Sequence, residues 1–194
     1  MKNYLKKYPT LGCCGLDCGM CPAYYTDGSS RCPGCCGEDF FEKHPSCSYI
    51  TCCVKKKGLE VCAQCKDYPC AKFEGASSGP DVKTTAKNIL LNQQFIQEFG
   101  IAKYMEQQEL RIKMLRSMLE NYNDGRSKTF YCLATTLLSV DGLKKALNEA
   151  DQIIEAEGVN EDNMKGRAKV LKGILNRKAG EEGEILKMRK GKYN

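Results

Sequence analysis

The chain has 194 residues, a formal net charge of +6 and 14 cysteines, and it contains no run of about 18 apolar residues that would predict a membrane span. Its first twelve residues carry three lysines and no continuous apolar stretch, so we predict no secretory signal and expect a cytoplasmic protein. In that reducing compartment, dense cysteines hold metal more often than they form disulfides.

The positive charge is weak evidence for nucleic-acid binding. A Zn²⁺ ion held by four thiolates carries a net charge of −2, so two such sites would lower the formal +6 to about +2. Basic residues remain clustered at 55–57 and near the C-terminus, at Lys187, Arg189, Lys190 and Lys192. We expect both clusters to be solvated rather than to bind phosphate.

Residues 1–75 are predicted to form a small metal-stabilised cysteine-rich domain with little regular structure. Of the 14 cysteines, 13 lie between Cys13 and Cys70, whereas aliphatic side chains are few in this part of the chain. Apolar burial alone cannot offset the conformational entropy that such a segment loses on folding, so the segment needs cross-links such as bound metal ions. Residues 76–83, which contain Gly79-Pro80, are predicted to be a linker.

An all-α helical bundle is predicted over residues 84–180, followed by a basic C-terminal tail at 181–194. Apolar periodicity predicts helix from about residue 84 to a stop at Gly100, and again from there toward residue 123. Ser127 and Asp141 are predicted to cap the next two helices, and a last helix is expected over 162–178 before Gly180. The side chains expected to face the core are Ile89, Ile96, Phe99, Tyr104, Ile112, Leu115, Leu119, Phe130, Leu133, Ala134, Leu137, Leu143, Ala146, Leu147, Ala150, Ile154, Met164, Ala168, Leu171 and Leu175.

Ten cysteines have the spacing of metal ligands. Two sulfurs separated by two residues can bind one metal from a tight turn, and three such CxxC pairs occur within the cysteine-rich segment. We expect two zinc ions. The predicted ligands are Cys14, Cys18, Cys21, Cys32, Cys35, Cys47, Cys52, Cys62, Cys65 and Cys70.

Two pairings of these ligands fit the spacing. One places a first zinc on Cys32, Cys35, Cys47 and Cys52 and a second on Cys18, Cys21, Cys62 and Cys65. The other builds a larger second centre, either two zincs with shared thiolates or an iron–sulfur cluster, from Cys14, Cys18, Cys21, Cys62, Cys65 and Cys70. Both pairings require the two ends of the segment to meet and close a long loop.

The remaining cysteines and the single histidine are not expected to bind metal. Neighbouring residues seldom both reach one metal, so one member of each vicinal pair should pack as a small apolar group. We do not favour His44 as a ligand because Pro45 stiffens the backbone beside it, and we expect Cys132 to be a core thiol. The vicinal pairs are Cys13-Cys14, Cys35-Cys36 and Cys52-Cys53.

Four motifs resemble an uncharacterised family of cysteine-rich bacterial and archaeal proteins, a domain of unknown function. They are CGLDCGMCPAYY at 14–25, CPGC at 32–35, CSYITC at 47–52 and KGLEVCAQCKDYPCAKF at 57–73. The helical sequence at 123–138 resembles the C-terminal half of longer members. The resemblance implies zinc binding by the ten cysteines named above, leaves Cys13, Cys36 and Cys53 outside the pattern, and implies no established biochemical role.

The function predicted from these features is that of a structural zinc protein, with a helical domain for binding an unidentified protein partner; an enzymatic role is left open but is not favoured. Closed four-cysteine sites leave no open position for water, and no acid, base or nucleophile constellation stands out. The alternatives are an iron–sulfur redox protein and a zinc-dependent nucleic-acid-binding protein. A thiol reductase would need a thioredoxin-like strand and helix around one CxxC, which the sequence does not predict. The aromatic residues expected to cover the metal sites, or to stack on bases, are Tyr24, Tyr25, Phe40, Phe41 and Tyr68.

Overall fold

The computed structural model describes residues 4–78 and 80–190, and it has helices and turns but no β-strand in these ranges. The chain divides into two compact units, residues 1–106 with 188–194 and residues 107–187. The division falls inside helix α2 (Ile89–Asn121), whereas the sequence predicted a linker at 76–83. The physical reason is that the first part of α2 shares an apolar cluster with the cysteine-rich segment. That cluster contains Leu11, Val61, Ile96, Tyr104 and Met105.

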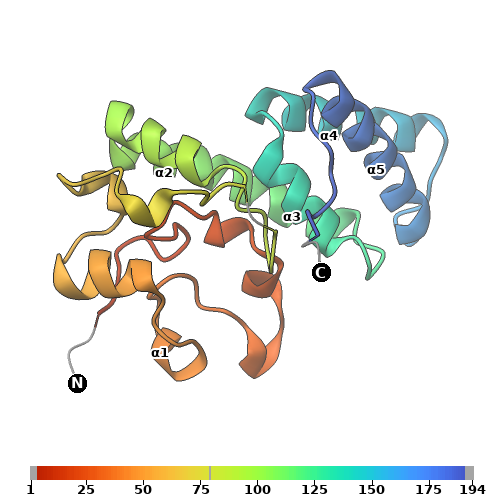
Figure 1. Cartoon of the computed structure of the whole chain (residues 1–194). Coiled ribbons are helices and arrows are strands. Elements are labelled where there is room, and N and C mark those ends of the chain that lie inside the picture. Colours follow the sequence, from red (N-terminus) through yellow and green to blue (C-terminus); the bar gives the residue numbers. More distant parts are fainter. Residues whose placement is uncertain (1–3, 79, 191–194) are drawn as a thin grey trace. The chain divides into compact units, whose positions relative to one another are not determined.

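Regular structure in the cysteine-rich segment is short, as its glycine, proline and cysteine content predicts (Figure 1). One four-residue helix, α1 (Phe40–Lys43), precedes a π-helical segment at Ile50–Lys56 that carries Cys52 and Cys53. The rest is loop and short 3₁₀ turns, so that packing and hydrogen bonds, rather than long helices, fix the positions of the sulfurs. The turns are Cys18–Met20, Pro22–Tyr25, Gly28–Ser30, Cys62–Gln64 and Ala71–Phe73.

The two ends of the cysteine-rich segment meet, which confirms the expected closure of a long loop. The amide of Cys62 donates to the carbonyl of Cys13 at 2.8 Å. Gln93, completely buried on α2, bridges both ends: its Nε2 donates to the Cys13 carbonyl at 3.2 Å and its Oε1 accepts from the Ala63 amide at 2.6 Å. Because both polar atoms of this buried side-chain amide have hydrogen-bond partners, Gln93 holds the two ends of the segment together.

The CGLDC loop is attached to α2 by its residues that are not cysteines. Gly15 has a φ of +94°, and a Cβ there would lie 2.7 Å from the carbonyl oxygen of Ile89. Asn92 donates to the Gly15 carbonyl at 2.8 Å and to the carboxylate of Asp17 at 3.0 Å, and the Tyr104 hydroxyl donates to the same carboxylate at 2.5 Å. The glycine and the aspartate of the motif therefore position the loop.

Helix α2 is interrupted at Gly100, where φ is 85° and ψ is 159°, and helix resumes after it. The expected stop at Gly100 is thus a break within the element. Ile96 is buried, but Phe99 is 54 % exposed, so the prediction that Phe99 faces the core is wrong. The cause is local: beside the break, the Phe99 ring lies against Phe95, with centroids 4.8 Å apart, instead of following the buried face.

The second unit contains α3 (Lys128–Leu137), α4 (Val140–Ala156) and α5 (Met164–Glu181), and α4 packs against α5. The predicted helical character of this part of the chain is confirmed. Phe130 and Leu137 of α3, by contrast, are only partly buried, because α3 turns Tyr131 inward. The predicted core residues that are buried in these three helices are Leu133, Ala134, Leu143, Ala146, Ala150, Ile154, Ala168, Leu171 and Leu175.

The helix ends differ from the prediction at two places. Ser139 caps α4 by accepting from the Gly142 amide at 2.9 Å, so the prediction of Asp141 as the cap is wrong. Asp141 lies in the first turn, where its carboxylate favours the positive end of the helix dipole and pairs with Lys145 at 2.8 Å. Ser127 occupies the cap position of α3, but its hydroxyl donates to Asp124 and makes no cap hydrogen bond.

Among the described residues, none of the helices combines the length and the apolar character that crossing a bilayer requires. The segment after α5 is held in place by Arg189, whose guanidinium pairs with Asp81 at 2.7 Å and also donates to the carbonyl of Ser77. Arg189 of the predicted basic tail therefore binds the predicted linker. Gly79 and Lys192, named in those two predictions, lie outside the described residues.

Candidate metal centre

All 14 cysteines are free thiols, and the ten predicted ligands lie mainly in two groups. The first group joins two CxxC turns. Burial raises the pKa of Cys18 and of Cys21, and repulsion from neighbouring sulfurs adds to the shift, from Cys35 at Cys18 and from Cys32 at Cys21. Electrostatic repulsion thus links Cys18 with Cys35 and Cys21 with Cys32, and neither predicted pairing assigns these two CxxC segments to one metal.

The second group lines a cavity of about 210 Å³. Its wall carries five cysteines, Cys52, Cys53, Cys62, Cys65 and Cys70. Aromatic rings close the same cavity: Phe73 lies 4.8 Å from Tyr68 and 5.2 Å from Tyr49, measured between ring centroids. The predicted aromatic cover is thus found here for Tyr68, together with two aromatic residues that the sequence analysis did not name.

Cys14 and Cys47 are close to members of both groups. Burial raises the pKa of Cys14 to about 12, and repulsion from Cys35 and Cys47 contributes. Burial also raises the pKa of Tyr49, with further contributions from the sulfurs of Cys14, Cys62, Cys47 and Cys70. The sulfurs of the segment therefore form one continuous neighbourhood with two denser parts.

Backbone amides donate to the sulfurs of three cysteines, all of them predicted ligands. The Cys35 sulfur accepts from the Cys13 amide at 3.4 Å, Cys65 accepts from Asp67 at 3.4 Å, and Cys47 accepts from Ile50 at 3.5 Å. Such donors favour the ionised sulfur, and ligands of bound metals are commonly oriented in this way. The backbone of Leu16 lowers the pKa of Cys14, and that of Ala23 and Tyr24 lowers the pKa of Cys21, in each case against the larger effect of burial.

The three cysteines expected to be spare occupy the centre of the sulfur cluster. Cys13, Cys36 and Cys53 are 0 to 2 % exposed. Thiol hydrogen bonds connect them to predicted ligands, with Cys13 between Cys35 and Cys53, Cys36 beside Cys35, and Cys62 beside Cys53. These bonds lower the pKa of Cys35 and Cys53, which accept them, and raise that of Cys13. The three thiols not expected to bind metal are buried, as predicted, and they also stabilise the ionised form of neighbouring sulfurs.

Lys6 places a positive charge beside the sulfurs, a feature that the sequence analysis missed. Only 7 % of the residue is exposed, its ammonium donates to the carbonyl of Leu11, and it has no carboxylate partner among the described residues. Its charge lowers the pKa of several cysteines, Cys35 and Cys53 among them. A buried ammonium is costly unless negative charge is close, so its position favours thiolates in this cluster. One lysine among three in the first seven residues gives no sequence signal of burial.

Two lysines of the 55–57 run have partners within the chain. The Lys57 ammonium lies 2.5 Å from the carboxylate of Asp67 and 2.8 Å from the sulfur of Cys65, and the pair with Asp67 is the main reason that its pKa is raised. Lys55 lies over aromatic rings. The run is therefore a weaker phosphate-binding patch than its charge alone indicates.

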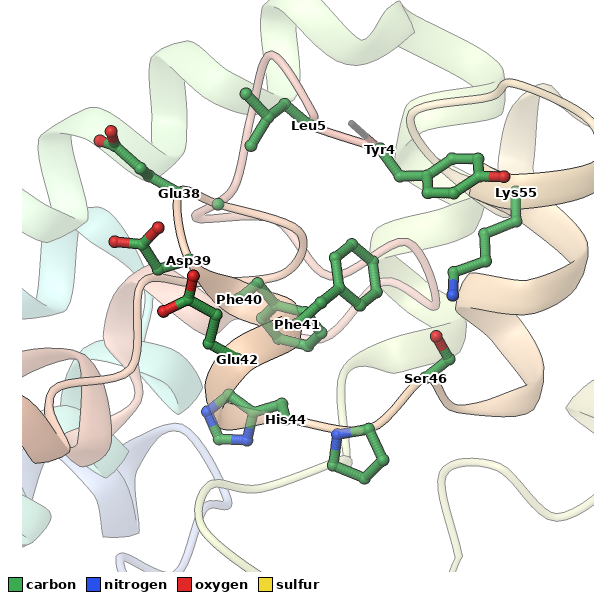
Figure 2. A pocket seen from close by; sticks show the side chains of 12 residues that line it. Tyr4, Leu5, Glu38, Asp39, Phe40, Phe41, Glu42, His44, Ser46 and Lys55 are labelled. Carbon is green, nitrogen blue, oxygen red and sulfur yellow. The ribbon is translucent and has the colours of Figure 1, made fainter. Parts of the chain in front are cut away.

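His44 lines a cavity without cysteines, and Cys132 belongs to the second unit. The ring of His44 stacks on Phe40 with centroids 5.0 Å apart, in a second cavity whose lining contains no cysteine (Figure 2). Cys132 is 1 % exposed within α3.

The chemistry of the donors fits a thiolate-bound metal, but the side-chain positions do not converge on one. Within residues 4–78 and 80–190, no three Cys, His, Asp or Glu side chains are arranged to hold a metal ion. Binding would require sulfurs to turn away from the thiol hydrogen bonds described above. In comparisons with known proteins, no family model, no curated protein and no solved structure matches the chain.

Proposed function

We propose that the cysteine-rich unit is a structural zinc module in which thiolates hold the metal. The observation that carries the proposal is the set of backbone amides donating to the sulfurs of Cys35, Cys47 and Cys65. In the described part of the chain, each sulfur that accepts from a backbone amide belongs to a predicted ligand, and none belongs to Cys13, Cys36 or Cys53. The buried ammonium of Lys6 supports the same proposal, because thiolates would supply the negative charge that it lacks.

The two groups of sulfurs support a pairing of ligands different from both pairings that the spacing predicts. A first zinc would be held by Cys18, Cys21, Cys32 and Cys35, two CxxC segments whose sulfurs interact electrostatically. A second would be held by Cys52, Cys62, Cys65 and Cys70, which line one cavity. Cys14 and Cys47 would lie beside both and could replace a ligand in either.

When bound, zinc would supply the positive charge and the cross-links that this segment needs in order to fold. Its apolar cluster is small and includes Cys35, Phe40, Ile50 and Val54. Four-sulfur coordination leaves no open position for a substrate, so we propose a structural role and a protein partner, with the helices available for binding it.

The test is anaerobic purification followed by elemental analysis and removal of the metal with a chelator. We expect about two zinc ions per chain, and we expect chelation to unfold residues 4–78, read as loss of amide hydrogen-exchange protection there. Protein that contains no metal, or that keeps its protection after the metal is removed, contradicts the proposal.

The vicinal pairs provide matched controls for the ligand assignment. Cys35→Ala should remove about one zinc per chain, whereas Cys36→Ala should leave the zinc content unchanged, since only Cys35 accepts a backbone amide. Cys132→Ala, a buried thiol in α3, should also retain both ions. Equal losses from Cys35→Ala and Cys36→Ala would refute the assignment.

One observation favours an iron–sulfur cluster as a second candidate. The cavity next to Phe73 is lined by five thiols rather than four, together with aromatic rings. The Lys57 ammonium donates to the sulfur of Cys65, and such hydrogen bonds to sulfur set the reduction potential of iron–sulfur clusters. A brown anaerobic preparation with iron and acid-labile sulfide, and with Cys65→Ala colourless, would support this candidate over zinc.

A further inference from the structure

A cavity of about 880 Å³, separate from the sulfur cluster, opens beside α1 (Figure 2). Its volume is within the range of pockets that bind ligands. Consecutive rings of Phe40 and Phe41 form its centre, and Tyr4 and Lys55 line one side. Phe41 is 39 % exposed, so its ring offers apolar surface to a ligand.

The aromatic faces of this cavity already bind a cation from the same chain. The Lys55 ammonium lies 4.6 Å from the centroid of the Phe41 ring and 5.4 Å from that of Tyr4. Rings in this geometry attract ammonium and guanidinium groups through their quadrupoles. The cavity therefore has the chemistry of a cation site.

The carboxylates of Glu38, Asp39 and Glu42 lie on the opposite side of the phenylalanine pair from Lys55 (Figure 2). None of the three makes an ion pair or a side-chain hydrogen bond in the described chain. Three carboxylates against one lysine make the lining acidic, although the whole chain is formally +6. An acidic cavity favours a cationic ligand over an anionic one.

We infer that this cavity binds a segment of a partner protein in which arginine or lysine side chains alternate with large apolar side chains. The apolar side chain would cover Phe41 while the cation pairs with Glu38, Asp39 and Glu42 at the acidic side. The inference rests on the proposed function only in that bound zinc would keep α1 folded against the sulfur cluster; the chemistry of recognition is independent of the metal.

The experiment uses the protein as purified, with its metal content measured in every sample. A capped peptide of alternating leucine and arginine is titrated by calorimetry, alongside the same peptide with citrulline, and with glutamate, in place of arginine. We expect the arginine peptide to bind about tenfold more tightly than the citrulline peptide, and to weaken as salt is raised. The triple variant E38Q/D39N/E42Q should abolish this preference. Asparagine at position 39 tolerates the local φ of +57°, so the backbone should be unchanged.

Lys55→Gln is the matched control, because it removes a charge of the opposite sign from the same cavity. It should leave arginine-peptide binding unchanged or make it tighter, since Lys55 competes for the rings. The inference is overturned if the citrulline peptide binds equally well, if no peptide binds, or if the glutamate peptide binds best and loses its affinity in Lys55→Gln. Wild-type protein that contains zinc but binds no peptide would contradict this inference alone, whereas metal-free protein that still binds the arginine peptide would contradict only the proposed function.

Discussion

In the CGLDC motif, the residues between the cysteines position the loop against α2. Gly15 is required twice, because its φ of +94° is one that side chains rarely adopt and because the Ile89 carbonyl leaves no room for a Cβ. Asp17 is 4 % exposed and bonds to α2 instead of facing a ligand. The motif therefore combines sulfur ligands with the contacts that position them.

We predict that Gly15→Ala destabilises the first unit by about 3 kcal/mol, roughly 1 kcal/mol from the left-handed backbone and the rest from the clash. Gly28→Ala is the control, because Gly28 also has a positive φ of +72° but has no atom within 4 Å of the point that a Cβ would occupy. It should cost only about 1 kcal/mol. Urea denaturation measures both, and equal costs would argue against the steric role of Ile89.

At the scale of elements, the first part of α2 stabilises the cysteine-rich segment from outside it. Gln93 bridges both ends of the closed loop, and Asn92 and Tyr104 hold Asp17. Gly100 interrupts the helix between these contacts without ending it. The helix therefore replaces part of the apolar core that the cysteine-rich sequence lacks.

Removing one of these contacts should loosen the loop. Tyr104→Phe deletes a buried hydrogen bond to a carboxylate, so we expect a loss of about 2 kcal/mol and faster hydrogen exchange at residues 13–18. Tyr8→Phe serves as a control, because the Tyr8 hydroxyl has no hydrogen-bond partner within the described ranges. A similar loss from both variants would show that the Asp17 contact is unimportant.

At the scale of the whole molecule, the chain returns to its first unit after α5 through a buried ion pair. The side chain of Asp81 is 1 % exposed and that of Arg189 is 34 % exposed. Burial is the largest single effect on Asp81 and opposes its ionisation, but hydrogen bonds from Arg189 and Ala86 together outweigh it and lower the pKa. The ion pair stabilises the folded protein only while Asp81 is charged.

The ionisation of Asp81 makes the free energy of unfolding depend on pH. Because the folded pKa of Asp81 lies below the unfolded value near 3.9, its contribution is present above that value and is lost as the pH falls through the folded pKa. Asp81→Asn should therefore lower the free energy of unfolding by about 2 kcal/mol at neutral pH, with a difference that shrinks below about pH 4. Denaturation curves at several pH values measure it, and a difference independent of pH would contradict the ion-pair argument.

The sequence predicted those features that depend on local pattern. The helices of the second unit follow from apolar periodicity, and the CxxC turns follow from spacing. Two features it failed to predict depend on contacts that the local pattern does not contain: the burial of Lys6 and the interaction of Cys32 with Cys21. The capping of α4 by Ser139 is local, but Ser139 and Asp141 are both cap-forming residue types two positions apart, and the pattern does not choose between them. Spacing identifies residues that can act as ligands, but only packing decides which of them meet.

The hydrogen bond between Cys13 and Cys62 also sets an order of events during synthesis. Ten cysteines precede Cys62 in the chain, so all of them are already part of the nascent chain before the amide that closes the loop is added. During that period their thiols are without their final neighbours. If zinc holds this segment as proposed, the yield of correctly assembled protein should depend on the supply of metal during translation rather than on conditions afterwards.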